Sequence, residues 1–571
     1  MIHPSSRRNF IKKTALAAGA GLTAPLWQWS LRAAESPEST DGAASGRTLM
    51  PGPFQPTWES LVHNYRFPDW YRDAKFGIWA HWSAQCVPEQ GAWYARRMYL
   101  QGDKDYNYHV QTYGHPSKFG FMEIDNLWKA DRWEPEKLIA LYKRAGAKYF
   151  FALGTHHDNF GAYDSKYHGW NSVNVGPKKD LVGTWARAAR AAGLRFGVSN
   201  HSSWAPRWLQ PAYGYDGEGP LAGVRYDAYT LTKADGKGKW WEGLDPQDLY
   251  TGPSVVMPSG LTSAQAVRDW QNKNTSLAKS NPMPVASFCQ NWFLRTQDLV
   301  DKYKPDVLYF DTNELPIGQA GLDLVSHYYN SSVARNGGVV DVVVNGKHIE
   351  REHVGSFVED IERGVANGIR PEPWQTDTCI GDWHYSRAIA ERNGYKTVEQ
   401  VVGMLVDVVS KNGNLLLNVG PKSDGTIPDQ ARAILLEMGA WLRTNGDAIY
   451  GSRPWLLYGE GPTKVASSAK NSDLQVFTPE DIRFTTHNGS LYAIALGWPA
   501  SGELRVRSLA RGLPYLNARV CKVDLLGSSD AISFHQEPDG LHILLPKVPP
   551  DEPAFTFRIL ERQEGSSHCG S

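Results

Sequence analysis

Residues 134–157 read EPEKLIALYKRAGAKYFFALGTHH, and this stretch contains both kinds of element from which most of the chain is built. Apolar residues recur at helical spacing over 134–145, which predicts an amphipathic helix. The short apolar run 148–154 follows, and its length predicts a buried strand. Thr155 and then the polar residues His156–Asp158 follow it. The stretch therefore indicates a helix, a parallel strand and a candidate site position at the strand's carboxyl end.

The rest of the chain from about residue 70 repeats this pattern, with helical segments such as 180–192 between several apolar runs. Such alternation is typical of βαβ units, and eight strands fit a closed (β/α)8 barrel. The segment 206–281 is rich in Gly, Pro, Trp and charge without periodicity, so we expect loops over the barrel mouth. The eight expected strands are 75–81, 148–154, 195–200, 306–311, 339–345, 356–362, 374–380 and 414–419.

After Trp455 the pattern changes to a period of two between Gly, Pro and Asp turns, which predicts an antiparallel β-sandwich. The expected fold class is therefore α/β: a TIM-like (β/α)8 barrel followed by a C-terminal antiparallel β-sandwich. The sandwich strands are expected at 491–496, 503–509, 520–525, 540–545 and 554–559. The expected divisions are an export signal at 1–34, a linker at 35–53, the barrel at 54–457, the sandwich at 458–563 and a disordered tail at 564–571.

The amino terminus has the pattern of a targeting segment. Residues 6–12, SRRNFIK, precede a weakly apolar, Ala/Gly-rich run at 14–29, and Ala33-Ala34 offers a cleavage point. Consecutive arginines before such a run are typical of a twin-arginine export signal. We expect export from a bacterial cytoplasm, with a periplasmic or secreted product. No later run is long enough to span a bilayer, so no membrane association is expected once the signal is removed.

The composition narrows the classes of partner. The chain has 60 Lys+Arg and 60 Asp+Glu, hence a formal net charge of zero, which argues against a nucleic-acid-binding surface. Aromatic residues make up 12% of the chain, with 22 Trp, and aromatic faces bind the C–H faces of sugars. The five cysteines are scattered without the spacing of a zinc site, and no disulfide can be assigned. Carbohydrate is therefore a candidate class of ligand, and aromatic packing in the cores of large domains is the alternative explanation.

Polar residues end most of the expected barrel strands, where a barrel places its catalytic groups. Asp311 ends the apolar run VLYFD, and a rigidly held Asp suits a nucleophile that must be aligned with a reacting carbon. Glu362 is the leading second carboxyl group, and a retaining glycosidase needs the two about 5–5.5 Å apart. The polar strand ends are His81, His156–Asp158, His201, Asp311, Asn345 with Lys347, Glu362 and Asn418.

His156 and His157 also raise the question of a metal. Neighbouring residues on a strand point to opposite faces, so both can bind one ion only where the strand has already ended. No further ligand stands at metal spacing, whereas hydrogen bonds to sugar hydroxyls need no such geometry. We therefore favour a sugar site without a metal, and keep a metal-dependent barrel hydrolase as an alternative.

Several motifs closely resemble the α-L-fucosidases of glycoside hydrolase family 29, over about residues 60–457. The resemblance implies a retaining mechanism on a barrel followed by a β-sandwich, with no metal or organic cofactor and a fucosylated oligosaccharide or glycoconjugate as substrate. It leaves the oligomeric state open. The matching motifs are KFGIWAHW (75–82), WYARRM (93–98), THHDNF (155–160), VLYFD (307–311), PWQTDTCIG (373–381), SKNGNLLLNVGPKSDGTIP (410–428) and NGDAIYGSRPW (445–455).

By position, the resemblance makes Asp311 the nucleophile that attacks the anomeric carbon of fucose. It makes His81, His156 and His157 ligands of the fucose hydroxyls. His201 stands where the third strand delivers another contact. The remaining substrate-binding positions are Trp93 and Tyr309, which match sugar-contacting aromatics, and Lys347.

The sequence departs from the common family pattern at three site positions. Ala92 stands where many members have Glu, and Lys347 where Arg is common, although Lys cannot make a bidentate guanidinium contact. Gln375 replaces a Glu and cannot supply a proton, which leaves Glu362 as the expected acid/base. The alternatives for that role are Glu372 and Glu314.

These departures leave other functions open. One alternative is a glycosidase for a related sugar such as L-galactose, because the contacts at positions 92 and 347 differ from the common pattern. Another is a carbohydrate-binding pseudoenzyme that has lost its acid, against which the presence of Asp311 and Glu362 argues. The long segment 206–281 could also reshape the side of the pocket that receives the leaving group.

Overall fold

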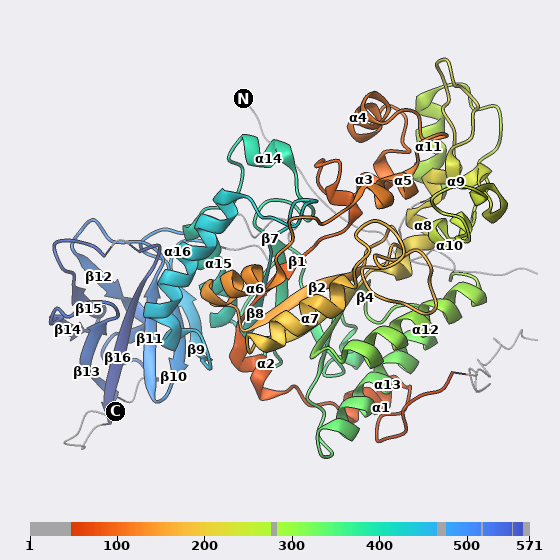
Figure 1. Ribbon diagram of the computed structural model, residues 1–571. Coiled ribbons are helices and arrows are strands. Elements are labelled where there is room, and N and C mark those ends of the chain that lie inside the picture. Colours follow the sequence, from red (N-terminus) through yellow and green to blue (C-terminus); the bar gives the residue numbers. More distant parts are fainter. Residues whose placement is uncertain (1–46, 276–282, 465–474, 516–517, 551, 564–571) are drawn as a thin grey trace, which may run out of the picture. The chain divides into compact units, whose positions relative to one another are not determined.

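The computed structural model describes residues 47–275, 283–464, 475–515, 518–550 and 552–563. The expected export signal and tail lie outside these residues. Within the compact unit Leu49–Ser571, eight parallel strands close into a barrel in chain order (Figure 1), which confirms the expected barrel. The strands are β1 Phe76–Ala80, β2 Tyr149–Thr155, β3 Arg195–Asn200, β4 Val307–Asn313, β5 Val343–Lys347, β6 Val358–Asp360, β7 Trp374–Cys379 and β8 Gly413–Asn418.

Alternation along the strands decides which side chains enter the barrel. In β4, Val307 and Tyr309 belong to the interior cluster, whereas Leu308 and Phe310 pack outward against the helices. Because the period is two, the same alternation turns Asp311 inward. The fifth strand starts at Val343, later than the expected 339, because its pairing with β4 begins at Val307↔Val343. Val339 lies outside the ladder and is 64% exposed.

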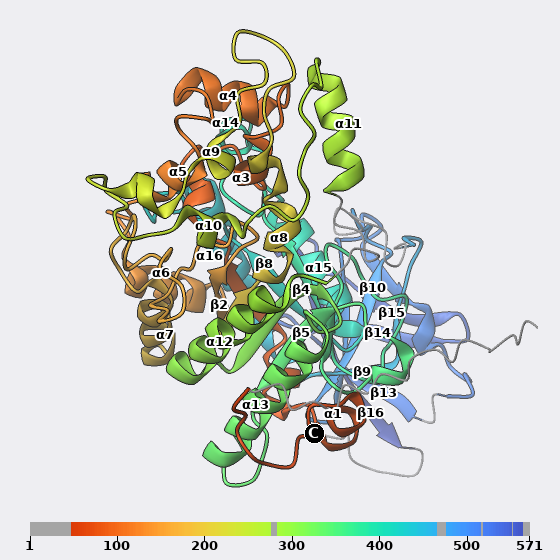
Figure 2. The ribbon, with the colours of Figure 1, turned by 90° about the vertical axis from the view of Figure 1, so that its right-hand side faces the viewer.

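Helices surround the barrel, and the long helices α12 and α13 lie side by side outside it (Figures 1 and 2). Residues 361–373, all of them described, contain no helix between β6 and β7. No helix among the described residues is both long and apolar enough to cross a bilayer. The helices outside the 206–281 segment are α1 Trp58–Asn64, α2 Asp69–Ala74, α3 Tyr94–Arg97, α4 Lys104–Thr112, α5 Phe121–Leu127, α6 Pro135–Arg144, α7 Leu181–Ala191, α12 Ala286–Tyr303, α13 Gln319–Arg335, α14 Arg387–Glu391, α15 Val398–Ser410 and α16 Asp429–Asn445.

The segment expected to form loops also contains helices, and that expectation was wrong in this respect. They are short apart from α11, so their periodicity is hard to recognise in the sequence. The segment packs against the residues that connect β1 to β2. In this contact the Tyr99 hydroxyl donates a hydrogen bond to Asp227 at 2.9 Å. The helices of this region are α8 Ala205–Trp208, α9 Asp227–Thr230, α10 Pro246–Tyr250 and α11 Ala264–Asn274.

The carboxyl-terminal part forms two antiparallel sheets around one apolar core, which confirms the expected sandwich. The five-stranded sheet has the order β13-β16-β11-β10-β9, and the three-stranded sheet the order β12-β15-β14. Strand β9 spans the expected domain boundary at residue 457 and pairs with β10. The strands are β9 Arg453–Glu460, β10 Ile482–His487, β11 Ser490–Ala495, β12 Glu503–Val506, β13 Ala518–Leu525, β14 Phe534–Glu537, β15 Gly540–Leu544 and β16 Phe555–Gln563.

Candidate active site

A cavity of about 130 Å³ lies at the carboxyl ends of the barrel strands. Every residue assigned above to catalysis or substrate binding lines it, although these residues extend along the chain from His81 to Glu362. Trp79 and Trp383, which stand in or beside the barrel-mouth motifs, and Asp377, which was not predicted, line it as well. The complete lining is Trp79, His81, Trp93, His156, His157, His201, Tyr309, Asp311, Lys347, Glu362, Asp377 and Trp383.

Asp311 is the most highly connected acid of this cavity. Its Oδ2 accepts hydrogen bonds from His157 Nε2 and His201 Nδ1, both at 3.2 Å, and its Oδ1 contacts the Lys347 ammonium. Burial would raise the pKa of Asp311, but the Lys347 charge and the two histidines outweigh it and hold that pKa well below its usual range. Asp311 is therefore ionised, as a carboxylate nucleophile must be.

Lys347 joins the two carboxyl groups that were predicted to react. Its Nζ contacts Asp311 and also donates to Glu362 Oε2 at 2.7 Å. The oxygens of the two acids consequently lie within two hydrogen-bond lengths of each other. Burial would lower the pKa of Lys347, but Asp311 and the neighbouring carboxylates outweigh it and raise that pKa well above its usual value. The ammonium thus shares its donors between two acids.

Beneath these groups lies a pair of acids that the sequence reasoning missed. The Tyr309 hydroxyl donates to Asp377 Oδ2 at 3.0 Å and lies 3.4 Å from Asp360 Oδ2. Gln375 Nε2 donates to Asp360 Oδ1 at 2.8 Å. Burial raises the pKa of Asp377 to about 6 and, together with Asp377, raises that of Asp360 well above its usual range. The signal in the sequence was the period of two, because Asp377 stands two residues after Gln375 on the same face of β7.

His81, His156 and His201 offer uncharged ring nitrogens to the cavity. Burial lowers the pKa of His81 and His156 well below its usual value, and lowers that of His201 to about 4. Both nitrogens of His81, and Nε2 of His201, are buried without a hydrogen-bond partner among the described residues. Such atoms cost free energy unless a ligand satisfies them. Their position on the cavity wall suits the hydroxyl groups of a sugar.

The histidines are also close enough for a metal to be considered. Strand β2 ends at Thr155, so His156 and His157 can both turn into the cavity. Ligand atoms of His156, His157 and His201 lie within 4.8 Å of one another, as do those of His81, His156 and His384. However, His157 already contacts Asp311 and, through Nδ1, the His201 carbonyl oxygen at 3.0 Å. These existing contacts compete with metal coordination by His157.

The other acids and amides that the sequence suggested for the site do not line this cavity. Glu314 accepts from His353 Nδ1 at 2.6 Å and does not line the cavity. Glu372 lies outside the cavity as well. Gln375 is buried deeper in the barrel, where its Oε1 accepts from the Tyr71 hydroxyl at 3.0 Å. Asn418 accepts the backbone N–H of His81 at 2.9 Å, so it positions the first strand end.

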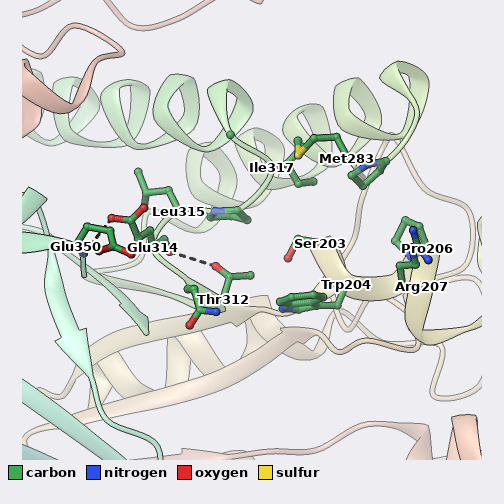
Figure 3. A pocket seen from close by; sticks show the side chains of 14 residues that line it. Ser203, Trp204, Pro206, Arg207, Met283, Thr312, Glu314, Leu315, Ile317 and Glu350 are labelled. Carbon is green, nitrogen blue, oxygen red and sulfur yellow. Dashed lines mark hydrogen bonds between the residues drawn. The ribbon is translucent and has the colours of Figure 1, made fainter. Parts of the chain in front are cut away.

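A second cavity of about 320 Å³ lies beyond the ends of β3, β4 and β5 (Figure 3). Trp204 and Thr312 form one side of it in this view, and Ile317 and Met283 form the opposite side. Glu314 and Glu350 are at one end of the view and Arg207 at the other. The lining therefore combines apolar side chains with the hydroxyls of Ser203 and Thr312, and charged groups lie at its ends.

Comparison with known proteins agrees with this geometry. The sequence profile of the family described as Alpha-L-fucosidase matches residues 43–447, and that of the alpha-L-fucosidase C-terminal domain matches 476–560. The chain belongs to the alpha-L-fucosidase family. It is thus a glycoside hydrolase, and its relatives include the human tissue alpha-L-fucosidase, which is 28% identical over 534 residues, 91% of this chain and 94% of the relative.

Solved structures of fucosidases have the same architecture. The Thermotoga maritima alpha-fucosidase has a TM-score of 0.63 and 28% identity, covering 89% of this chain and all of the other. A GH29 alpha-L-fucosidase from Bacteroides thetaiotaomicron, at 18% identity and a TM-score of 0.57, shares the fold.

Proposed function

We propose that this fucosidase is an exo-acting enzyme that releases terminal α-L-fucosyl residues from glycans with retention of configuration. The observation that supports this most directly is the pair Asp311 and Glu362, joined by one ammonium in a cavity of only about 130 Å³. A cavity of this size suits one terminal sugar ring. Two carboxyl groups this close leave no room for the water that an inverting enzyme places between them.

In the proposed mechanism, Asp311 attacks the anomeric carbon while Glu362 donates its proton to the departing glycosidic oxygen. Water then attacks the fucosyl-enzyme ester, Glu362 takes a proton from that water, and Asp311 leaves as a carboxylate. His81, His156, His157 and His201 would bind ring hydroxyls, and Trp93 and Tyr309 would contact the sugar. Glu362 is favoured over Glu314 and Glu372 because only Glu362 lines the cavity with Asp311.

The stereochemistry of the product and one variant test this proposal together. NMR of an α-L-fucoside hydrolysis should show the α-anomer of fucose first. Asp311→Ala should lower kcat by at least about 10⁴-fold while the circular dichroism spectrum stays native, because the covalent step loses its nucleophile. First appearance of the β-anomer, or near-normal turnover by the variant, would refute the assignment.

The alternatives make different predictions in the same assays. A panel of aryl α-L-fucoside, α-L-galactoside, β-D-galactoside and α-L-arabinoside distinguishes fucose from related sugars. A pseudoenzyme would bind fucose without turning over any member of the panel. Loss of activity after exhaustive chelation, restored by a divalent metal, would support the metal-dependent alternative instead.

We also propose that the chain is exported by the twin-arginine route, on the basis of the SRRNFIK segment. Replacement of Arg7 and Arg8 by Lys should keep the enzyme in the cytoplasmic fraction of a bacterial host. Unchanged recovery from the periplasm would contradict this proposal.

A further inference from the structure

The second cavity lies next to the candidate active site, although no residue lines both cavities. Thr312 directly follows Asp311, and the indole N–H of Trp204 donates to the Asp311 carbonyl oxygen at 2.7 Å. The backbone N–H of Glu314 donates to the Lys347 carbonyl oxygen at 2.7 Å. Since neighbouring Cα atoms are about 3.8 Å apart, the second cavity begins within one residue of the proposed nucleophile.

The second cavity is larger than the cavity at Asp311, and a glycan substrate needs more room than one sugar ring. Ligand pockets usually have about 300–1,000 Å³. The cavity at Asp311, with about 130 Å³, is too small for more than the terminal sugar, whereas the second cavity has about 320 Å³. A glycan attached to that terminal sugar must therefore continue outside the first cavity.

The second cavity has the chemistry of a saccharide site. The indole of Trp204 and the side chain of Ile317 offer apolar surface on opposite sides of it (Figure 3), which suits the C–H faces of a pyranose ring. Glu314 and Arg207 can accept and donate hydrogen bonds to hydroxyl groups at its ends. Ser203 Oγ is buried without a partner among the described residues and lies on the cavity wall. That hydroxyl would gain a hydrogen bond from a polyhydroxylated ligand.

From this arrangement we propose that the second cavity binds the leaving-group saccharide, that is, the pyranose to which the terminal fucosyl residue is attached. The inference rests on the proposed fucosidase function and adds the position of the next sugar. The contacts of this subsite lie in the segments that follow β3, β4 and β5. They would accordingly determine which fucosylated glycans are cleaved, whereas the cavity at Asp311 would recognise fucose itself.

The test compares a substrate that reaches the second cavity with one that does not. α-L-Fucosyl fluoride has a leaving group too small to enter it. The partner substrate is the best cleaved of four fucosyl disaccharides with 1→2, 1→3, 1→4 and 1→6 linkages. The measured quantity is kcat/KM on the disaccharide divided by kcat/KM on the fluoride.

Ser203→Leu, which fills the cavity, should lower this ratio at least about tenfold. Ile317→Ala, which removes part of the apolar wall, should lower it about fivefold and decides the question if the first variant does not fold. The control Ser259→Leu makes the same change at an exposed position of the 206–281 segment and should leave the ratio unchanged. An unchanged ratio in the folded cavity variants would overturn the inference. Failure of the wild type to hydrolyse the fluoride would instead contradict the proposed function.

Discussion

Lys347 lies between Asp311 and Glu362 and contacts both, which makes it the electrostatic centre of the site. The residue type could be read from the sequence, where Lys stands in place of a common Arg. Its sharing between two acids could not, because Glu362 is 15 positions further along and reaches Lys347 only through the pairing of β5 with β6. One ammonium thus contacts both carboxyl groups of the site.

The variant Glu362→Ala tests the proposed acid/base. We expect kcat/KM on substrates with poor leaving groups to fall by about 10²–10⁴-fold, because these need protonation of the departing oxygen. Activated aryl fucosides should lose less in the first step, and azide should restore turnover as the fucosyl azide. Glu372→Ala is the matched control and should show neither effect. The reverse pattern in the two variants would move the acid/base to Glu372.

Asp377 should make the free energy of unfolding depend on pH. Burial raises the pKa of Asp377 to about 6 from an ordinary value of 3.8, so the folded state binds its proton more tightly than the unfolded state. The stability contributed by this proton is present at low pH and is lost as pH rises through about 4 to 6. Asp377→Asn keeps the shape without the charge, and its free energy of unfolding should therefore improve relative to wild type between pH 4.5 and 7.5. Urea unfolding at both pH values measures this difference, and a pH-independent difference would contradict the assignment.

Strand β6 is shorter than its sequence pattern predicts, although its side chains alternate as expected. The expected strand 356–362 is observed only over Val358–Asp360, with a single pairing to β7 at Asp360↔Gln375. The period of two nevertheless holds, since Val358, Asp360 and Glu362 all face the barrel interior or its cavity. The chain turns after Asp360, and Arg363 adopts a left-handed φ of 49°. Where a strand stops depends on its neighbours, which a local pattern does not contain.

Helix α15 begins with a capping box. Thr397 caps it by accepting the backbone N–H of Gln400 at 3.3 Å, and the Gln400 side chain accepts the N–H of Thr397 at 3.0 Å. Such a capping box satisfies two otherwise unpaired donors. Thr397→Ala should lower the free energy of unfolding by about 1 kcal/mol, whereas Thr397→Ser should preserve most of it. Equal losses in the two variants, measured by urea unfolding, would show that the hydroxyl is not what matters.

At the scale of the whole molecule, a buried ion cluster connects the barrel to the C-terminal sheet. Asp407 on α15 accepts from Arg483 Nε on β10 at 2.6 Å and from Lys411 Nζ at 2.7 Å. All three side chains are at most 3% exposed. Because Asp407 is the acid that both cations share, it holds the cluster together across two parts of the fold.

Asp407→Ala leaves two cations buried without their acid, so it should cost about 3–5 kcal/mol of unfolding free energy. The partly exposed pair of Arg453 and Asp73 serves as the control. Asp73→Ala should cost no more than about 1 kcal/mol, because solvent screens that pair. Similar losses in the two variants, compared by guanidinium unfolding, would contradict a structural role for the buried cluster.

The sequence by itself determined the barrel and sandwich architecture and most of its strands, because periods of 2 and 3.6 are local properties of a chain, but it did not reveal the helices of the 206–281 segment. It also placed His81, His157, Asp311 and Glu362 at strand ends, which the topology of a parallel barrel brings to one rim. Only the tertiary structure decided that Lys347 joins two acids, that Asp377 lies beside Asp360, and that a second cavity adjoins the first. These features depend on strand register and on the packing of connections far apart in the chain. Their energies arise from contacts that no local pattern encodes.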